Sequence, residues 1–149
     1  ELVENAEQSF KLRVEHTGGK IYTEIEAINS TICVDEIHFT NAIFNLMDNA
    51  VKYSKPDCPL NIYLRTWNEG DNVFLSVRDT GRGIKKEAQK KVFDKFYRVH
   101  TGNRHDVKGF GLGLAYVKNI IESHKGKIFL ESTPGEGTIF TIQLPAVDI

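Results

Sequence analysis

The chain has 149 residues, of which 40% are hydrophobic and 26% charged, a composition typical of one globular domain that buries its own core. No apolar run approaches the roughly 18 residues that cross a bilayer, so we expect no direct membrane contact. Cys33 and Cys58 have neither a CxxC partner nor a histidine at ligand spacing, which argues against a disulfide or a cysteine metal site.

The formal net charge of −1 is unevenly distributed along the chain. Residues 1–50 hold nine acids and three basic residues, whereas residues 85–108 hold eight basic residues and three acids. The basic segment would attract an anion, although a solvated basic face is the simpler explanation of its charge. It lacks the repeated aromatic residues on which bases stack, so we expect no nucleic-acid partner.

The first part of the chain predicts a helix followed by two strands. Apolar residues recur at three- and four-residue steps through residues 2–17, and Gly18 and Gly19 then end the pattern, as expected for an amphipathic leading helix. Alternating apolar and polar residues over 20–27 predict a half-buried strand, and residues 31–34 predict a second, short one.

The next helix is predicted from an N-cap at Asp35 to Tyr53, with an apolar stripe formed by Phe39, Ile43, Leu46 and Ala50. Its opposite side carries a polar stripe at steps of four, four and three residues, formed by Asn41, Asn45, Asn49 and Lys52. The solvent-exposed side of an amphipathic helix would carry the same pattern of polar residues. Asparagine is, however, a poor helix former, and its amide oxygen is a plausible ligand for a hard cation, so the helix alone leaves both interpretations open. Asp48 lies one residue off the stripe and is expected to point elsewhere.

The second half predicts two directly joined strand pairs around helices. The strands cover residues 60–67, 72–78, 127–132 and 137–144, a short helix covers 85–92, a loop covers 99–109 and a longer helix covers about 113–124. This order predicts an α+β two-layer sandwich, in which a mixed, largely antiparallel sheet of about five strands packs on about three helices. A doubly wound nucleotide-binding fold is not expected.

Two glycine motifs could carry chemistry. In "DTGRGI" (79–84), Asp79 closes a strand before a Gly-x-Gly turn, so its carboxylate could accept a hydrogen bond from an exocyclic amine such as that of adenine. An acidic turn without function is the alternative. "GFGLGL" (109–114) begins a helix, where free N–H groups and the helix dipole favour phosphate, but it follows no strand and fits the dinucleotide fingerprint poorly.

Together with "NLMDNAVKY" (45–53), "FDKFYR" (93–98) and "GEGT" (135–138), these motifs resemble the N, G1, F, G2 and last glycine boxes of one family. The family is that of the ATP-binding catalytic domains of bacterial two-component sensor histidine kinases. They belong to the GHKL superfamily, with the Bergerat fold, which also contains the gyrase-type topoisomerase subunit, the MutL repair ATPase and a heat-shock chaperone. The F box separates the kinases from these relatives. The resemblance covers the whole chain, 1–149, with a leading helix at 1–18 and a flexible ATP lid at about 94–110.

The resemblance implies that ATP and Mg²⁺ are the cofactors, and it assigns a role to each matching residue. Asn49 would be the Mg²⁺ ligand, with Lys52 and Arg98 as the other catalytic residues near the phosphates. Phe93 and Phe96 would pack the base of the lid. The remaining residues expected to bind ATP are Asn45, Tyr53, Asp79, Gly81, Gly83, Ile84, Gly109, Phe110, Gly111, Leu112, Gly113, Leu114 and Thr138.

The family function that this implies is transfer of the γ-phosphoryl group of ATP to a histidine on a separate dimerisation domain, with a response regulator receiver domain downstream. None of the five histidines stands in a motif like HE[LIF][KR][TS]P, so we expect the phosphoacceptor domain upstream of Glu1. The fragment is expected to be a monomeric cytoplasmic domain, and inner-membrane anchoring of the parent protein is left open. The alternatives are a catalytically silent nucleotide-binding regulatory module and a superfamily ATPase or serine kinase.

Overall fold

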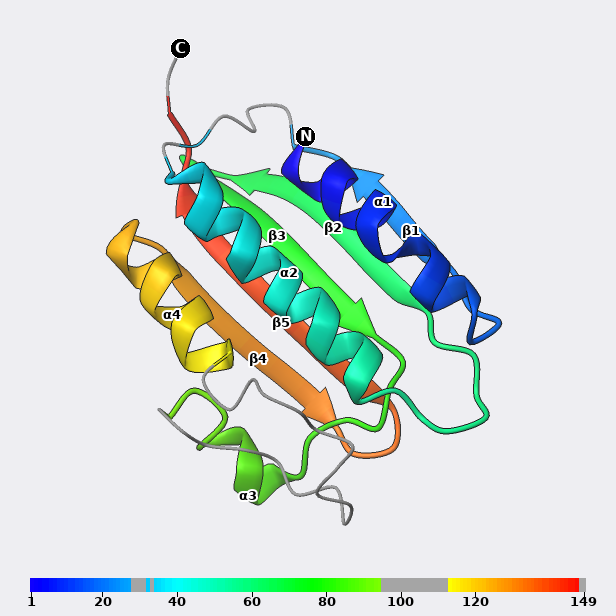
Figure 1. Ribbon diagram of the computed structural model, residues 1–149. Coiled ribbons are helices and arrows are strands. Elements are labelled where there is room, and N and C mark those ends of the chain that lie inside the picture. The colour runs from blue at the N-terminus through cyan, green and yellow to red at the C-terminus, as the bar shows by residue number, and fades with distance from the viewer. Residues whose placement is uncertain (28–31, 33, 95–112, 148–149) are drawn as a thin grey trace.

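A computed structural model describes residues 1–27, 32, 34–94 and 113–147 (Figure 1). The described part forms two layers, with helices packed on one face of a five-stranded sheet. The helices are α1 (Leu2–Glu15), α2 (Glu36–Lys52), α3 (Lys86–Gln89) and α4 (Gly113–Ser123). The strands are β1 (Ile21–Ile25), β2 (Ile62–Glu69), β3 (Asn72–Asp79), β4 (Lys127–Thr133) and β5 (Gly137–Pro145).

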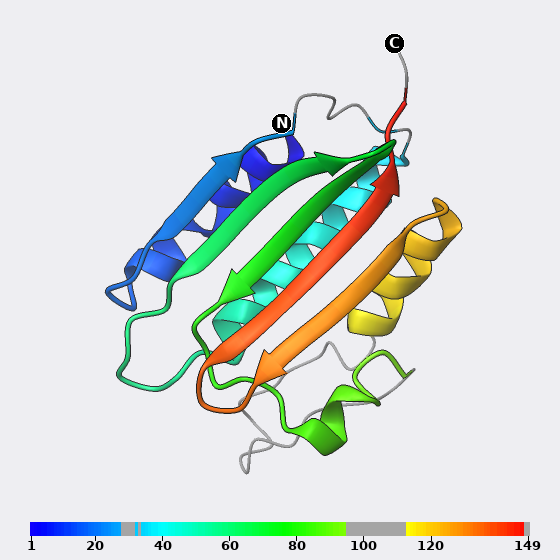
Figure 2. The same ribbon diagram turned by 180° about the vertical axis from the view of Figure 1, so that it is seen from behind.

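The sheet has the strand order β1-β2-β3-β5-β4. β1 pairs in parallel with β2, and the other three strand pairs are antiparallel. Helices α1, α2 and α4 lie side by side on one face of this sheet, and the view from behind shows the other face without a helix (Figures 1 and 2). The predicted α+β sandwich with a mixed, largely antiparallel sheet is confirmed.

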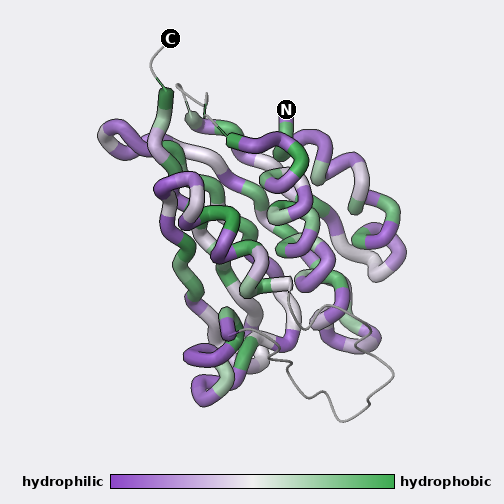
Figure 3. Tube along the Cα trace, turned by 60° about the vertical axis from the view of Figure 1, so that its left-hand side comes forward, coloured by the Kyte–Doolittle hydropathy of each residue, from purple (hydrophilic) through white to green (hydrophobic). Residues whose placement is uncertain are grey.

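The core lies between α2 and the sheet. Asp35 caps the helix by accepting a hydrogen bond from the backbone N–H of His38 at 3.1 Å. The buried face of α2 is formed by Phe39, Ala42, Ile43, Leu46, Met47 and Ala50. The predicted apolar stripe is therefore the buried one. Figure 3 shows hydrophobic and hydrophilic residues alternating along the turns of the helices, as one-sided burial requires.

The two outer helices flank α2. From α1, residues Ala6, Phe10 and Val14 are buried, and the Phe10 ring meets Phe44 of α2 edge to face at 5.5 Å between centroids. On the other flank, the backbone N–H of Asp35 donates to His124 Nε2 at 3.0 Å, and His38 Nδ1 lies 3.0 Å from the Tyr116 hydroxyl. These contacts hold α4 against the N-terminal end of α2.

The face of the sheet without helices carries paired aromatic side chains. Tyr22 stacks on Tyr63, and Trp67 stacks on Phe74, with ring centroids 5.0 Å and 5.3 Å apart. The Arg65 guanidinium lies over the Trp67 ring at 4.7 Å. The rings therefore cover one another, which reduces the apolar area that this face exposes to water.

Some predicted boundaries differ from the structure. The short helix expected over 85–92 is only α3, because its single turn has no buried residue to extend an apolar face. Of the strand expected over 31–34, the two described residues, Ile32 and Val34, lie outside any strand. The loop at 99–109 lies outside the described residues, as does the lid apart from Asp94. In the part of the chain that is described, no helix is both long and apolar enough to cross a membrane.

Candidate functional site

Asp79 ends β3 and lies opposite Thr138 of β5. Its Oδ1 accepts a hydrogen bond from the backbone N–H of Gly81 at 2.9 Å, and the backbone N–H of Thr138 donates to the same carboxyl group. Burial raises the pKa of Asp79 to about 6, against the lowering effect of these two hydrogen bonds. The strand end thus holds a largely buried carboxylate that forms no ion pair with a cation among the described residues.

The turn after Asp79 is fastened to the end of α2. The backbone N–H of Arg82 donates to the Tyr53 carbonyl at 3.0 Å, and Arg82 Nε donates to the Ser54 carbonyl at 3.0 Å. A Cβ on Gly81 would lie 2.7 Å from the Tyr53 carbonyl oxygen and 3.0 Å from Asp79 Oδ1, so no side chain fits there. Close backbone packing therefore requires glycine at position 81.

Gly83 has a different requirement. Its φ is +72°, and a Cβ there would overlap the carbonyl of Thr133 at the end of β4. The structure thus gives a backbone reason for the second glycine of the motif. That the two glycines also leave room for a base stays a prediction.

Ser132 connects the turn to β4 and β5, and the sequence motifs do not include it. Its Oγ accepts from the backbone N–H of Ile84 at 2.7 Å and donates to the Gly137 carbonyl at 2.9 Å. Since its single proton is used there, the hydroxyl of Thr138, 2.9 Å away, must be the donor between the two side chains. Thr138 therefore supports Asp79 through its backbone and Ser132 through its hydroxyl.

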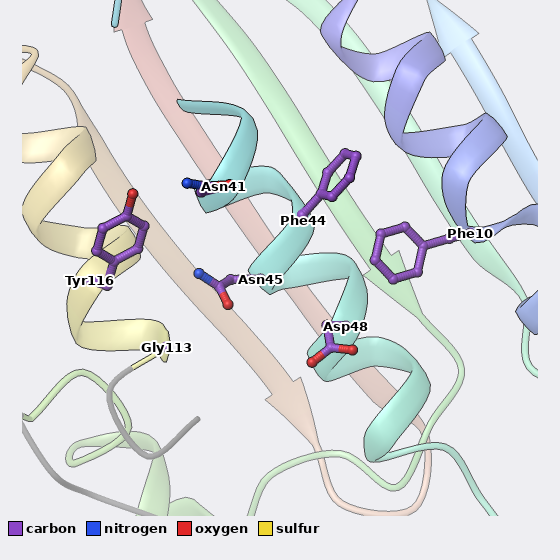
Figure 4. A pocket seen from close by; sticks show the side chains of 7 residues that line it. All are labelled: Phe10, Asn41, Phe44, Asn45, Asp48, Gly113 and Tyr116. Carbon is purple, nitrogen blue, oxygen red and sulfur yellow. The ribbon is translucent and has the colours of Figure 1, made fainter. Parts of the chain in front are cut away.

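The polar side of α2 lines a pocket of about 560 Å³ that also touches α1 and α4. Figure 4 shows Asn41 and Asn45 on the side of α2 that faces Tyr116 of α4, and Phe44 on the side that faces Phe10 of α1. Asp48 and the buried Gly113 complete the lining. Two members of the predicted polar stripe thus face a space large enough for a small ligand.

The expectation that Asp48 points elsewhere is wrong. Asp48 lines the same pocket as Asn45. Its Oδ2 lies 3.0 Å from Lys52 Nζ, one helical turn further on, and its Oδ1 lies 3.1 Å from Arg13 Nη2 of α1. The (i, i+4) spacing to Lys52 and the position of α1 explain this orientation.

The other predicted site residues fall into two groups. Asn49, Lys52 and Tyr53 are half-buried at the C-terminal end of α2, and Ile84 and Leu114 pack against the core. Phe93 meets Phe140 edge to face at 6.2 Å. Phe96, Arg98, Gly109, Phe110, Gly111 and Leu112 lie outside the described residues. The structure therefore brings the N-box helix, the G1 turn and the start of α4 to one end of the sandwich.

Residues 34–148 match the family described as histidine kinase-, DNA gyrase B-, and HSP90-like ATPase. The chain belongs to this family. The predicted resemblance is confirmed, and the glycine-bearing turn, the polar helix and the start of α4 belong to an ATPase-type domain. The individual roles of the site residues remain predictions.

Named relatives agree with this membership. The chain is 60% identical over 145 residues to the sensor protein RprX of Bacteroides fragilis, a match that covers 97% of this chain and 28% of that protein. It is 37% identical over 112 residues to the sensor histidine kinase WalK of Bacillus subtilis, covering 75% of this chain and 18% of WalK. The chain thus spans less than a third of the length of these relatives.

Solved structures agree on the fold. The nucleotide-free catalytic domain of the histidine kinase ThkA superposes with a TM-score of 0.81 at 24% identity, over 97% of this chain and 90% of that one. Full-length ShkA, solved in complex with AMPPNP, gives a TM-score of 0.82 at 26% identity, over 99% of this chain and 30% of ShkA.

The raised pKa of Asp79 predicts a pH-dependent loss of stability. Between the ordinary pKa of 3.8 and about 6, the folded state holds a proton that the unfolded state has lost, so the free energy of unfolding falls as the pH rises through this window. The contribution of Asp79 to this fall is about 2 to 3 kcal/mol. Urea unfolding of the wild type and Asp79→Asn at pH 4.5 and 7.5 measures it. The variant should gain stability relative to the wild type at the higher pH, and an equal difference at both pH values would contradict the raised pKa.

Proposed function

We propose that the chain binds ATP with Mg²⁺ and, as the catalytic domain of a sensor histidine kinase, donates the γ-phosphoryl group to a histidine on a separate dimerisation domain. The observation that carries the proposal is the buried Asp79 carboxylate in its glycine turn, next to the polar end of α2, in a member of this ATPase family. The relatives named as sensor histidine kinases and the ShkA structure with AMPPNP support it.

Adenine fits the Asp79 turn for chemical reasons. A carboxylate accepts hydrogen bonds from the exocyclic amine of adenine, whereas guanine has a carbonyl at that position, which would repel it. Because residue 81 is glycine, no side chain lies against Asp79 Oδ1; a Cβ there would be 3.0 Å from this oxygen. Burial makes an unpaired carboxylate costly, so a donor in the ligand would relieve part of that cost.

The donor set of α2 fits Mg²⁺. The amide oxygens of Asn45 and Asn49 are hard ligands, and Mg²⁺ keeps several waters and takes few ligands from the protein. We assign Asn49 as the ligand, with Asn45 beside it. The bound metal ion supplies neutralisation of the phosphate charge.

The remaining proposed roles concern the phosphates. Phosphoryl transfer needs positioning and charge stabilisation more than covalent help, so we assign no general base to the chain. Lys52 would meet a phosphate, Arg98 would face the terminal phosphates, Tyr53 would close the pocket, and the phosphate chain would be cradled by Gly109, Gly111 and Gly113. Gly113 begins α4, whose N-terminus favours an anion.

The partners follow from the same proposal. We infer a phosphoacceptor domain upstream in the parent protein, a response regulator receiver domain as the next acceptor, and a cytoplasmic location for this domain. The isolated domain is expected to be monomeric. Relatives that extend well beyond the matched region are consistent with further domains in the parent protein.

Asp79→Asn should weaken ATP binding by about 1 to 3 kcal/mol, because the variant leaves a buried amide mispaired with the adenine amine. Titration calorimetry with ATP and GTP in the presence of Mg²⁺ measures this, and the wild type should bind ATP selectively. Asp71→Asn is the matched control, since Asp71 is exposed in the turn between β2 and β3 and should leave the affinity unchanged. Unchanged affinity in Asp79→Asn would remove Asp79 from the site.

Asn49→Ala should abolish the dependence of ATP binding on Mg²⁺, since the proposed metal ligand is lost. The measurement is the ratio of ATP affinities with and without Mg²⁺. Asn119→Ala, at an exposed position of α4, is the control and should keep the ratio of the wild type. An undiminished ratio in Asn49→Ala would show that the metal is held elsewhere.

Phosphoryl transfer is tested by supplying the dimerisation domain of the parent protein together with Mg²⁺ and γ-labelled ATP. We expect acid-labile, alkali-stable phosphate on that domain, as for phosphohistidine. A phosphoserine product would instead establish a serine kinase. ATP binding without any transfer would identify a regulatory module.

A further inference from the structure

Arg13, which belongs to none of the sequence motifs, completes a charged cluster at the pocket on α2. The Asp48 carboxylate lies between two cations, with Oδ1 at 3.1 Å from Arg13 Nη2 and Oδ2 at 3.0 Å from Lys52 Nζ. Each carboxylate oxygen thus has its own cation. Asp48 and Lys52 belong to the proposed N box, whereas Arg13 comes from α1.

The balance of charge in this cluster gives Arg13 a role. Asp48 lines the pocket, and an unneutralised carboxylate there would repel a phosphate group and cancel the charge of Lys52. With Arg13 present, the three side chains sum to one positive charge. The cluster then keeps a net positive charge beside the pocket, which it would lose without Arg13.

We propose that Arg13 is a positioning residue for nucleotide binding, which engages and neutralises Asp48 so that the cluster with Lys52 keeps a net positive charge toward a phosphate group. The inference rests on the proposed function, in which Lys52 meets a phosphate. It adds to that function a residue outside the motifs, on a different helix, which acts through Asp48.

The packing of α1 fixes where Arg13 lies. Its guanidinium carbon lies over the Phe10 ring at 5.0 Å from the centroid, and Phe10 itself packs edge to face on Phe44 of α2. Val14, the next residue along the chain, is fully buried in the core. The compensating charge is therefore delivered by the docking of α1, which makes phosphate affinity depend on that helix.

Arg13 could instead only fasten α1 to α2, and the two roles differ in their response to a second substitution. If Arg13 neutralises Asp48, removal of the Asp48 charge makes Arg13 dispensable. If Arg13 only holds α1 against α2, Asp48→Asn removes the other partner of the same ion pair. It then cannot restore the ATP affinity that Arg13→Gln has lost. Adenosine distinguishes the two roles further. It has no phosphate group, so its binding should not depend on the charge of the cluster.

The experiment compares ATP affinity by calorimetry, and adenosine affinity by NMR titration, for the chain and for Arg13→Gln, Asp48→Asn, the double variant and Lys52→Ala. Arg13→Gln should weaken ATP binding roughly three- to tenfold at low ionic strength, and less in high salt. Adenosine affinity should not change. The double variant should return to within about twofold of the wild type, the change of charge being cancelled. Lys11→Gln is the matched control, because Lys11 is exposed on α1 and forms no ion pair with any described residue.

Three results would overturn the inference. If the double variant binds ATP as weakly as Arg13→Gln, and adenosine binding is weakened in parallel, Arg13 only holds α1 against α2. A normal ATP affinity in Arg13→Gln, while Lys52→Ala binds ATP weakly, would remove Arg13 and leave the proposed function standing. Unchanged ATP affinity in Lys52→Ala would instead show that Lys52 meets no phosphate, so that its proposed role would fail together with this inference.

Discussion

The packing of α2 across the middle of the sheet is the interaction on which the rest of the structure depends. Leu46 and Met47 of α2 are almost fully buried in the core. Because the apolar residues of this helix recur at three- and four-residue steps, only one of its faces can pack on the strands. Because that face is fixed, the orientation of every other side chain on the helix is fixed as well. Asn45 and Asp48 reach the pocket because Leu46 and Met47 must reach the core.

The turn after β3 lowers the stability of the fold, because it holds the Asp79 carboxylate in a largely buried position. A buried carboxylate that pairs with no cation in the described part of the chain disfavours folding once it is ionised, and two backbone N–H groups offset only part of that cost. The surrounding network holds the turn in place from two sides, through the end of α2 and through Ser132 of β4. A carboxylate in an unfavourable environment is thus held in place by hydrogen bonds among the residues around it.

The features that could be predicted from the sequence are those encoded locally. The hydrophobic period of α2, the two strand pairs and the glycine turn after β3 all depend on residues a few positions apart, and the structure contains them. The contact of Arg13 with Asp48 joins residues on separate helices, so no period or motif contains it. The role of Ser132 could not be predicted from the sequence for the same reason. Its partners Ile84 and Gly137 come together only when the turn packs against β4. The predicted length of α3 was wrong for another reason, because the sequence pattern did not show that none of the residues of this helix is buried.

The parallel pairing of β1 with β2 has a consequence for the order of folding. β2–β3 and β4–β5 join neighbouring strands through short turns, whereas Ile21 pairs with Ile62 only after the chain has passed through α2. Loop closure over that distance carries a larger entropy cost than a hairpin does, so we expect the hairpins and α2 to assemble first. β1, together with α1 just before it, then pairs with a β2–β3 hairpin that has already formed. The helix that carries Arg13 is thereby held in place only after α2 and the β2–β3 hairpin have formed.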